Sequence, residues 1–131
     1  MKKPYNPILG EVFYAKWDTA TRGTTKMVAE QVSHHPPVSA FFFENRKSNV
    51  LFNGHIYTRS KFLGNSAACI MEGQSQLYFI NRNAEEYVIT MPTVYVRGVI
   101  WGTLIMEIGG KVTLSCKATD THCEIEFKTK V

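Results

Sequence analysis

The stretch Thr24-Thr25-Lys26-Met27-Val28-Ala29-Glu30-Gln31-Val32 is rich in residues that favour β-strands, and it runs into Ser33-His34-His35-Pro36-Pro37. Proline has no N–H to donate and biases the preceding residue toward extended geometry, so the pattern predicts a strand with a rigid end. We expect both imidazoles to be fixed there in roughly opposed directions. Strand formation does not call for two histidines followed by two prolines, and this end is therefore a candidate site.

The same period of two, in which alternate side chains share one face, recurs along the rest of the chain. It is clear in 121–129 and is repeated in 11–17, 50–57, 76–81 and 86–91. Turn signals separate the runs, at 18–23, 45–49, 64–66, 81–83 and 109–110. No helical period persists. The sequence therefore predicts an all-β, mainly antiparallel fold, a meander of about ten short strands that curls into a barrel or a strongly twisted sheet.

Composition limits the class of protein. The 131 residues are 44% hydrophobic and 20% charged, which is typical of one folded domain. The net charge of +4 is spread without clusters of Lys and Arg, so no nucleic-acid partner is expected. No signal peptide or membrane-spanning stretch is apparent, which favours a cytosolic location. Cys69, Cys116 and Cys123 have no zinc-ligand spacing, and we expect no metal and no cofactor.

The histidine pair has two interpretations from the residues alone. It could be a buried turn whose imidazoles bond to backbone carbonyls, or it could donate to an anionic ligand, because histidine offers donors in both protonation states. A second segment bears on this choice. Lys3-Pro4-Tyr5-Asn6-Pro7-Ile8-Leu9-Gly10-Glu11 places a cation and an amide on a chain stiffened by two prolines.

These two segments, K-P-Y-N-P-I-L-G-E followed by E-Q-V-S-H-H-P-P, resemble the lipid-transfer domain of the oxysterol-binding protein and its relatives. Both motifs occur in the family's order and spacing, and the resemblance continues over essentially all 131 residues. The family domain is longer than this chain. The resemblance therefore implies that residues 1–131 are a partial domain, the central strands of a large lipid-binding β-barrel, without its N-terminal lid and C-terminal segment.

The resemblance also implies a function without catalysis. Proteins of this family carry a lipid in a tunnel inside the barrel and exchange it between membranes for phosphatidylinositol 4-phosphate. By the family pattern, His34 and His35 contact the 4-phosphate. Lys3 and Asn6 reach the glycerol-linked phosphate and the inositol ring. The partners implied are these lipids and, peripherally, the membranes that hold them.

The resemblance to one subgroup of the family suggests which lipid is exchanged for phosphatidylinositol 4-phosphate. Residues 45–111 look most similar to relatives anchored in the endoplasmic reticulum, which exchange phosphatidylserine for phosphatidylinositol 4-phosphate at contacts with the plasma membrane. The same location is expected here, on the cytoplasmic side. A sterol in place of phosphatidylserine, or a sensor that binds the phosphoinositide without transfer, remains an alternative.

A β-barrel hydrolase is the rival class. His34 or His35 would act as general base, with Glu30 or Glu44 as its orienting carboxylate. Ser33 is a poor nucleophile for this scheme, because neighbouring side chains on a strand diverge. We also expect a partial barrel to self-associate, since open strand edges and an uncovered apolar face tend to pair with another chain.

Overall fold

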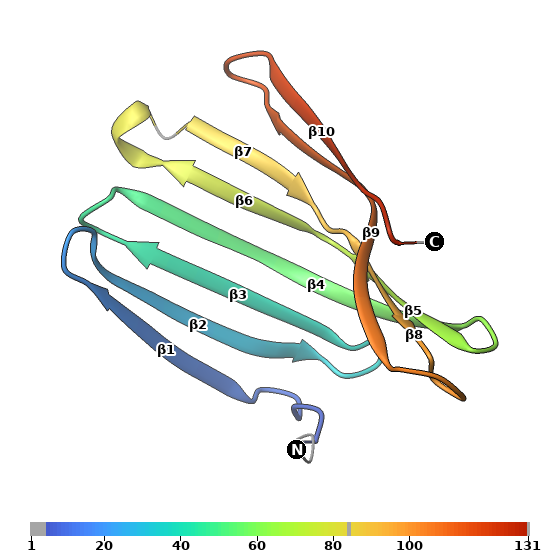
Figure 1. Ribbon diagram of the computed structural model, residues 1–131. Helices are drawn as coiled ribbons and strands as arrows, with labels where there is room; N and C mark the ends of the chain where they lie inside the picture. Colours follow the sequence, from blue (N-terminus) through green and yellow to red (C-terminus); the bar gives the residue numbers. More distant parts are fainter. Residues whose placement is uncertain (1–4, 84, 131) are drawn as a thin grey trace.

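The computed structural model describes residues 5–83 and 85–130, and within them the chain forms ten strands and one 3₁₀ turn (Figure 1). All strand pairs are antiparallel, as the alternation predicts. The strands are β1 Val12–Thr19, β2 Gly23–Ser33, β3 Val38–Asn45, β4 Val50–Phe62, β5 Ser66–Glu72, β6 Gln74–Phe79, β7 Glu85–Thr90, β8 Thr93–Arg97, β9 Ile105–Cys116 and β10 Thr121–Phe127; the 3₁₀ turn is η1 Ile80–Arg82.

The predicted meander is confirmed, with two of its strands each broken in the middle. β5 and β6 pair with the same long strand β4 in one register, since Tyr57 lies opposite Glu72 and Gly54 lies opposite Ser75. Gly73 separates the two halves with a φ of +133°, and a Cβ there would collide with the carbonyl oxygen of His55. β7 and β8 form the next broken strand, and β9 and β10 complete the order.

One predicted turn is wrong. Gly109 and Gly110 lie inside β9, at the point where this long strand changes partners. Gly109 pairs with Thr93 of β8, and Gly110 pairs with Phe127 of β10. A Cβ on Gly109 would lie 2.8 Å from the ring of Tyr95, and Gly110 has a φ of +90°, so the glycines serve close packing and backbone geometry within a strand rather than a turn.

One face of the sheet carries a cluster of aromatic rings. Residues paired directly across antiparallel strands share a face, which places Phe43 with Phe52 and Phe41 with Gly54. The rings of Phe41, Phe43 and Phe52 lie 5.4 to 5.9 Å apart, and Trp17 stacks on Phe43 at 6.1 Å. We call this side the aromatic face. Phe42, which lies between Phe41 and Phe43 in the sequence, is on the opposite face and is exposed.

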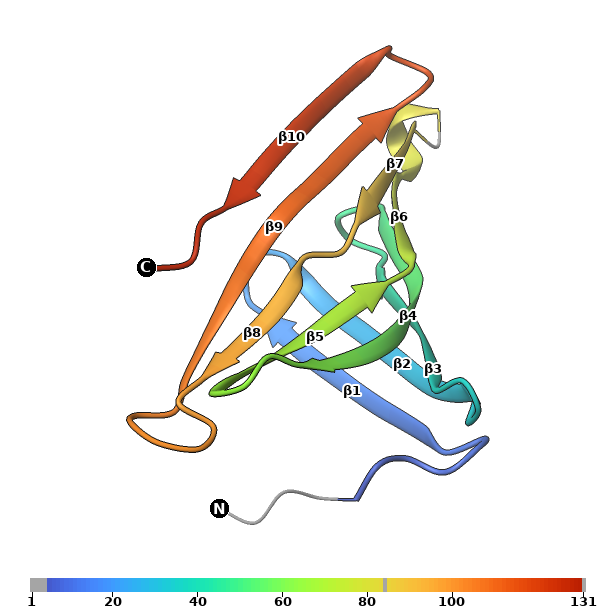
Figure 2. The same ribbon diagram turned by 90° about the vertical axis from the view of Figure 1, so that its right-hand side faces the viewer.

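The sheet has no second layer within the described residues. Viewed from the side, it curves so that the β9–β10 hairpin does not continue the plane of β1 to β3 (Figure 2). Few side chains are buried, among them Ala68, Val112 and Cys116, whereas many large apolar side chains are exposed. No helix in the described part of the chain is long and apolar enough to cross a membrane.

Candidate functional site

The histidine pair occupies the turn that joins β2 to β3. β2 ends at Ser33, as the prolines predict, and the four residues 34–37 form the turn before β3 begins at Val38. The expectation that the imidazoles point in opposed directions is not met. The ring centroids of His34 and His35 lie 4.5 Å apart with an angle of 58° between the ring planes, because the pair sits in a turn and not on the alternating strand.

Both imidazoles line one pocket, of about 500 Å³, and Asn6 lies on its wall. The structure thus brings together three of the four residues that the sequence proposes as a headgroup site. Lys3, the fourth, lies outside the described residues. The remaining lining comes from the N-terminal segment and from β2 to β5, namely Pro7, Gln31, Pro37, Ser39, Ile56, Thr58 and Met71.

Gln31 holds the base of this pocket in place. Its side chain is 5% exposed. Its Nε2 donates to the Ser33 carbonyl at 2.8 Å, directly before His34, and its Oε1 accepts the Ser39 hydroxyl at 2.5 Å. A buried amide whose oxygen and nitrogen are both hydrogen-bonded holds the backbone in place on each side of the turn. It therefore fixes the position of the backbone that carries the histidine pair.

The backbone of Gln31 also ties down the N-terminal segment. Gly10 N–H donates to the Gln31 carbonyl at 2.8 Å, and Gln31 N–H donates to the Glu11 carbonyl at 3.1 Å. Glu11 closes the preceding turn by accepting the Ile8 N–H on Oε2 at 2.9 Å. These bonds extend the β1–β2 ladder and bring Asn6 beside the histidines, across some 28 residues of sequence.

The pocket offers hydrogen-bond donors and no carboxylate. Imidazole and amide N–H groups are available on His34, His35 and Asn6, and none of the described lining residues is Asp or Glu. Glu30 precedes Gln31 on β2, so its side chain projects from the other face. Among residues 5–83 and 85–130, no three His, Cys, Asp or Glu side chains gather as a metal site would require.

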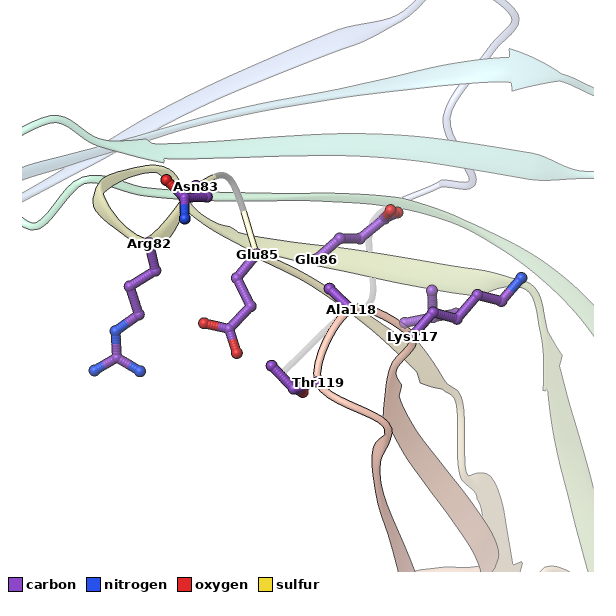
Figure 3. Close-up of a pocket in the computed structure, with 8 residues that line it drawn as sticks. Arg82, Asn83, Glu85, Glu86, Lys117, Ala118 and Thr119 are labelled. Atoms are coloured by element: carbon purple, nitrogen blue, oxygen red, sulfur yellow. The ribbon is translucent and has the colours of Figure 1, made fainter.

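Two further cavities differ in character from the histidine pocket. One, of about 620 Å³, lies on the aromatic face at the far ends of β2 and β3, against Phe43, Phe52 and Leu77. The other, of about 850 Å³, lies between the turn after β6 and the β9–β10 turn (Figure 3), with Arg82, Asn83, Glu85, Glu86, Val88, Lys117, Ala118 and Thr119 around it.

The carboxylates of this third cavity are engaged by tyrosines. The Tyr87 hydroxyl donates to Glu85 at 2.5 Å, and this bond raises the pKa of Tyr87. The Tyr78 hydroxyl donates to Glu86 at 3.0 Å, and removal from water, followed by that bond, raises the pKa of Tyr78. Its mixed charges and bonded acids distinguish this cavity from the donor-lined histidine pocket.

Sequence reasoning missed Gln31, Ser39, Thr58 and Met71 as parts of the pocket. The alternation could have placed Gln31 on the inner side of its strand, and a buried amide would then have needed partners. Thr58 and Met71 are directly opposite each other on β4 and β5. Their place in the pocket depends on that register and on the curvature of the sheet, which leave no local signal in the sequence.

Comparison with known sequences gives a match over the whole chain. The family profile described as "Oxysterol-binding protein" covers residues 1–131. The chain is 49% identical over 131 residues to mouse (Mus musculus) oxysterol-binding protein-related protein 5, covering 99% of this chain and 15% of that protein. It is 52% identical over 131 residues to oxysterol-binding protein 4 of Dictyostelium discoideum, covering 99% of this chain and 28% of that protein. The chain thus spans 15% to 28% of the length of these relatives.

Solved structures resemble the fold over nearly its full extent. The ORD of Osh3 from Saccharomyces cerevisiae, solved in complex with PI(4)P, superimposes with a TM-score of 0.82 and 28% identity, over 99% of this chain and 33% of that chain. The Osh1 ORD domain in complex with ergosterol gives a TM-score of 0.82 and 32% identity, over 98% and 30% respectively. The ten-stranded antiparallel sheet is therefore a part of a larger fold in both structures.

Proposed function

The chain belongs to the oxysterol-binding protein family, and on that basis we propose that it forms part of a lipid-transfer domain whose histidine pocket binds the headgroup of phosphatidylinositol 4-phosphate. The observation that carries this proposal is the convergence of Asn6, His34 and His35 on one pocket. As part of the same proposal, we expect a lid and a C-terminal segment to complete such a domain, since the relatives are several times longer than the chain.

The chemistry of the pocket suits a phosphate monoester. Such a group carries a charge of about −1.5 to −2 near neutral pH and offers three strong acceptor oxygens. Charge-assisted hydrogen bonds contribute about 1.5–3 kcal/mol each. Two imidazoles whose ring centroids lie 4.5 Å apart can donate to one phosphate group from two sides. Asn6 supplies a neutral amide for the rest of the headgroup, and we assign Lys3 to the same part of the ligand.

The acyl chains need an apolar surface, and the aromatic face supplies one. Withdrawing a diacyl lipid removes about 30 methylenes from hydrocarbon, and at about 0.8 kcal/mol each this is roughly 25 kcal/mol to be replaced. The cluster of Phe41, Phe43 and Phe52 and the cavity of about 620 Å³ beside it lie on the same face as the lining residues Ser39 and Ile56. A lipid with its headgroup at the histidines would direct its chains along this face.

For the second lipid we propose phosphatidylserine, exchanged between the endoplasmic reticulum and the plasma membrane. This rests on the resemblance of residues 45–111 to relatives with that activity, and the identity of 49% to oxysterol-binding protein-related protein 5 supports the same subgroup. A sterol is the second candidate, favoured by the Osh1 ORD domain structures with ergosterol and with cholesterol.

We propose binding and transfer, not catalysis, for the histidine pair. A hydrolase would need a carboxylate to orient the imidazole. Glu30 projects from the opposite face, and Glu44 is paired with Arg46 at 2.8 Å. Both carboxylates that the hydrolase hypothesis names are therefore poorly placed for it.

The test is extraction of phosphatidylinositol 4-phosphate from liposomes by the double variant His34→Ala/His35→Ala. Losing two charge-assisted contacts should cost about 3–6 kcal/mol of headgroup binding. The matched control is His55→Ala/His122→Ala, which removes two imidazoles that lie on β4 and β10 and do not line the pocket. Circular dichroism verifies folding. Unchanged extraction by a folded His34/His35 variant would refute the assignment.

Exchange assays then identify the second lipid. Donor liposomes with phosphatidylserine or with cholesterol are mixed with acceptors containing phosphatidylinositol 4-phosphate. Faster transfer of phosphatidylserine than of cholesterol supports the proposed exchange, and the reverse order supports the sterol. Binding of phosphatidylinositol 4-phosphate without transfer of either lipid would indicate a sensor.

A further inference from the structure

Two hairpin ends meet at one corner of the sheet and expose a group of apolar side chains. They are the β4–β5 turn, residues 63–65, and the β8–β9 loop, residues 98–104. We call the two together the apolar tip. Its exposed large apolar side chains are Leu63, Val99, Ile100, Trp101 and Leu104, with Phe62, Ile105 and Met106 on the flanking strands.

Asn65 holds the two parts of the tip together. Its Oδ1 accepts the N–H groups of Ile100 at 2.9 Å and Trp101 at 3.1 Å, its Nδ2 donates to the Trp101 carbonyl at 3.0 Å, and its backbone carbonyl accepts the Val99 N–H at 3.1 Å. The backbone N–H groups of Val99, Ile100 and Trp101 and the carbonyl of Trp101 are thus bonded within the tip, while the side chains of Ile100 and Trp101 stay 58% and 69% exposed. Internal bonding of this kind is what a segment needs before it enters lipid.

Around the tip, the cations Arg59, Lys61 and Arg97 outnumber the acids Glu72 and Glu107. Residues 58–71 contain Arg59 and Lys61 and no acid, and residues 92–106 contain Arg97 and no acid. Arg59 and Arg97 pair with Glu72 and Glu107, which lie just outside these ranges, whereas Lys61 forms no ion pair within the described part of the chain. A cation beside exposed apolar side chains suits an anionic lipid surface.

In Figure 2 the β4–β5 and β8–β9 ends that form the tip and the β2–β3 turn that carries the histidines all lie in the lower part of the view, on opposite sides of it. Thr58 and Met71, which line the pocket, are opposite each other on β4 and β5, and β4 then continues to Phe62 at the tip. The four residues from Thr58 to Phe62 span about 13 Å at the usual strand rise. A membrane that touches the tip would therefore lie close to the pocket.

We propose that the apolar tip is a membrane-insertion surface, in which Ile100 and Trp101 enter the interface of an anionic bilayer while Asn65 keeps the loop backbone bonded. The inference rests on the proposed function and deepens it, by naming the surface that meets the membrane when the headgroup enters or leaves the pocket. Tryptophan is well suited to this position, because its ring is apolar and its N–H remains free to bond at the headgroup level.

The first test uses the fluorescence of Trp101. The chain has two tryptophans, so a Trp17→Phe variant leaves Trp101 as the sole reporter. Vesicles of phosphatidylcholine and phosphatidylglycerol contain neither proposed ligand. Adding them should shift the Trp101 emission to the blue, and brominated acyl chains should quench it. An emission unchanged by vesicles would overturn the proposal, as would a shift already present without vesicles and lost on dilution, which would show that copies of the chain cover the tip.

The second test compares matched substitutions in sedimentation with the same vesicles. Ile100→Asp should lower the bound fraction about tenfold, since it replaces an inserted side chain with an anion. Ile80→Asp is the control, because Ile80 is 44% exposed but lies in η1 at the other end of the sheet. Equal losses in both variants would overturn the proposal.

These assays can refute the pocket assignment and the proposed role of the tip separately. His34→Ala/His35→Ala should bind the phosphatidylglycerol vesicles as the unchanged chain does, while it loses extraction of phosphatidylinositol 4-phosphate. Intact extraction without vesicle insertion by Trp101 would refute the tip and leave the pocket assignment standing. Normal vesicle insertion with unchanged extraction by the histidine variant would refute the pocket alone.

Discussion

Ser39 donates its hydroxyl proton to Oε1 of Gln31 at 2.5 Å, across the ladder that joins β2 to β3. The same amide donates to the carbonyl of Ser33, so one side chain links the end of β2, the start of β3 and the residue before the histidine pair. The geometry of the pocket therefore depends on a residue that need not contact the ligand.

Gln31→Ala should destabilise the fold by about 1–3 kcal/mol, the usual cost of leaving buried partners without hydrogen bonds. It should also weaken extraction of phosphatidylinositol 4-phosphate, because the turn loses its anchor. Urea unfolding measures the first effect and liposome extraction the second. Gln74→Ala, at an exposed glutamine on β6, is the control and should change stability by less than about 0.5 kcal/mol. Equal effects in the two variants would contradict this role for Gln31.

Asn6→Ala and the double histidine variant should separate the two proposed lipids. Asn6 and Lys3 are assigned to the part of the headgroup that glycerophospholipids share, so Asn6→Ala or Lys3→Ala should weaken binding of phosphatidylserine and phosphatidylinositol 4-phosphate together. His34→Ala/His35→Ala should spare phosphatidylserine. Binding to liposomes of each lipid measures the difference. Equal losses for both lipids in every variant would mean that the two segments do not divide the headgroup.

Acid should remove a contribution to stability from the β1–β2 hairpin. The Thr24 hydroxyl donates to the Asp18 carboxylate at 2.6 Å, and this bond, followed by the charge of Lys16, lowers the pKa of Asp18. A carboxyl whose pKa is lower in the folded state stabilises the fold above its unfolded pKa, and loses that effect as pH falls through the folded value.

The stability advantage of the unchanged chain over Asp18→Asn should therefore be constant near neutral pH and shrink below about pH 4. Thermal unfolding of the two proteins across the acidic range measures it. Thr24→Val should reduce the advantage, because the hydroxyl is the leading cause of the shift. A stability difference between the unchanged chain and the Asp18→Asn variant that does not vary with pH would exclude this linkage.

Self-association through the aromatic face remains a prediction. Phe13 and Tyr14 are neighbours on β1 and are 62% and 76% exposed, but only Phe13 is on the aromatic face, since it lies opposite Ala29, which lies opposite Phe41. Light scattering should show a dimer or a larger species. Phe13→Lys should shift it toward monomer, because a charge on an uncovered apolar face opposes pairing.

Tyr14→Lys provides the control for that experiment, since it adds the same charge to the same strand on the other face. A monodisperse species of 14.9 kDa for the unchanged chain would contradict the prediction. Equal dissociation in both variants would show that charge alone, and not the aromatic face, governs association.

The strands were predictable from the sequence because each has one apolar face, and the period of two records this directly. The ends of the strands were harder to predict from the sequence. The alternation places the end of the fourth strand near Tyr57, but β4 continues to Phe62, since β5 pairs with its polar end through backbone hydrogen bonds that need no apolar side chains. The prediction of a turn at Gly109 and Gly110 is wrong because glycine is common both in turns and at sites of close packing within strands.

The residues of the candidate site were also only partly predictable from the sequence. The histidine pair and Asn6 stood out because their residue types do not suit strands, and the fold brings them to one pocket. Their relative direction could not be predicted, since it depends on the turn and not on the strand period. Asn65 gave no signal as the residue that joins two hairpin ends, because its partners Ile100 and Trp101 are some 35 residues away in the sequence.

Every ladder of the sheet joins stretches that follow one another in the chain, if the two halves of each broken strand are counted together. Such a sheet can be completed during synthesis in the order in which its hairpins leave the ribosome, because no strand waits for a distant partner. The β1–β2 hairpin can form before β10 has been translated. The aromatic side chains of β3 and β4 would then be exposed while the later strands are made, and exposed apolar surface of this kind makes a growing chain prone to aggregation.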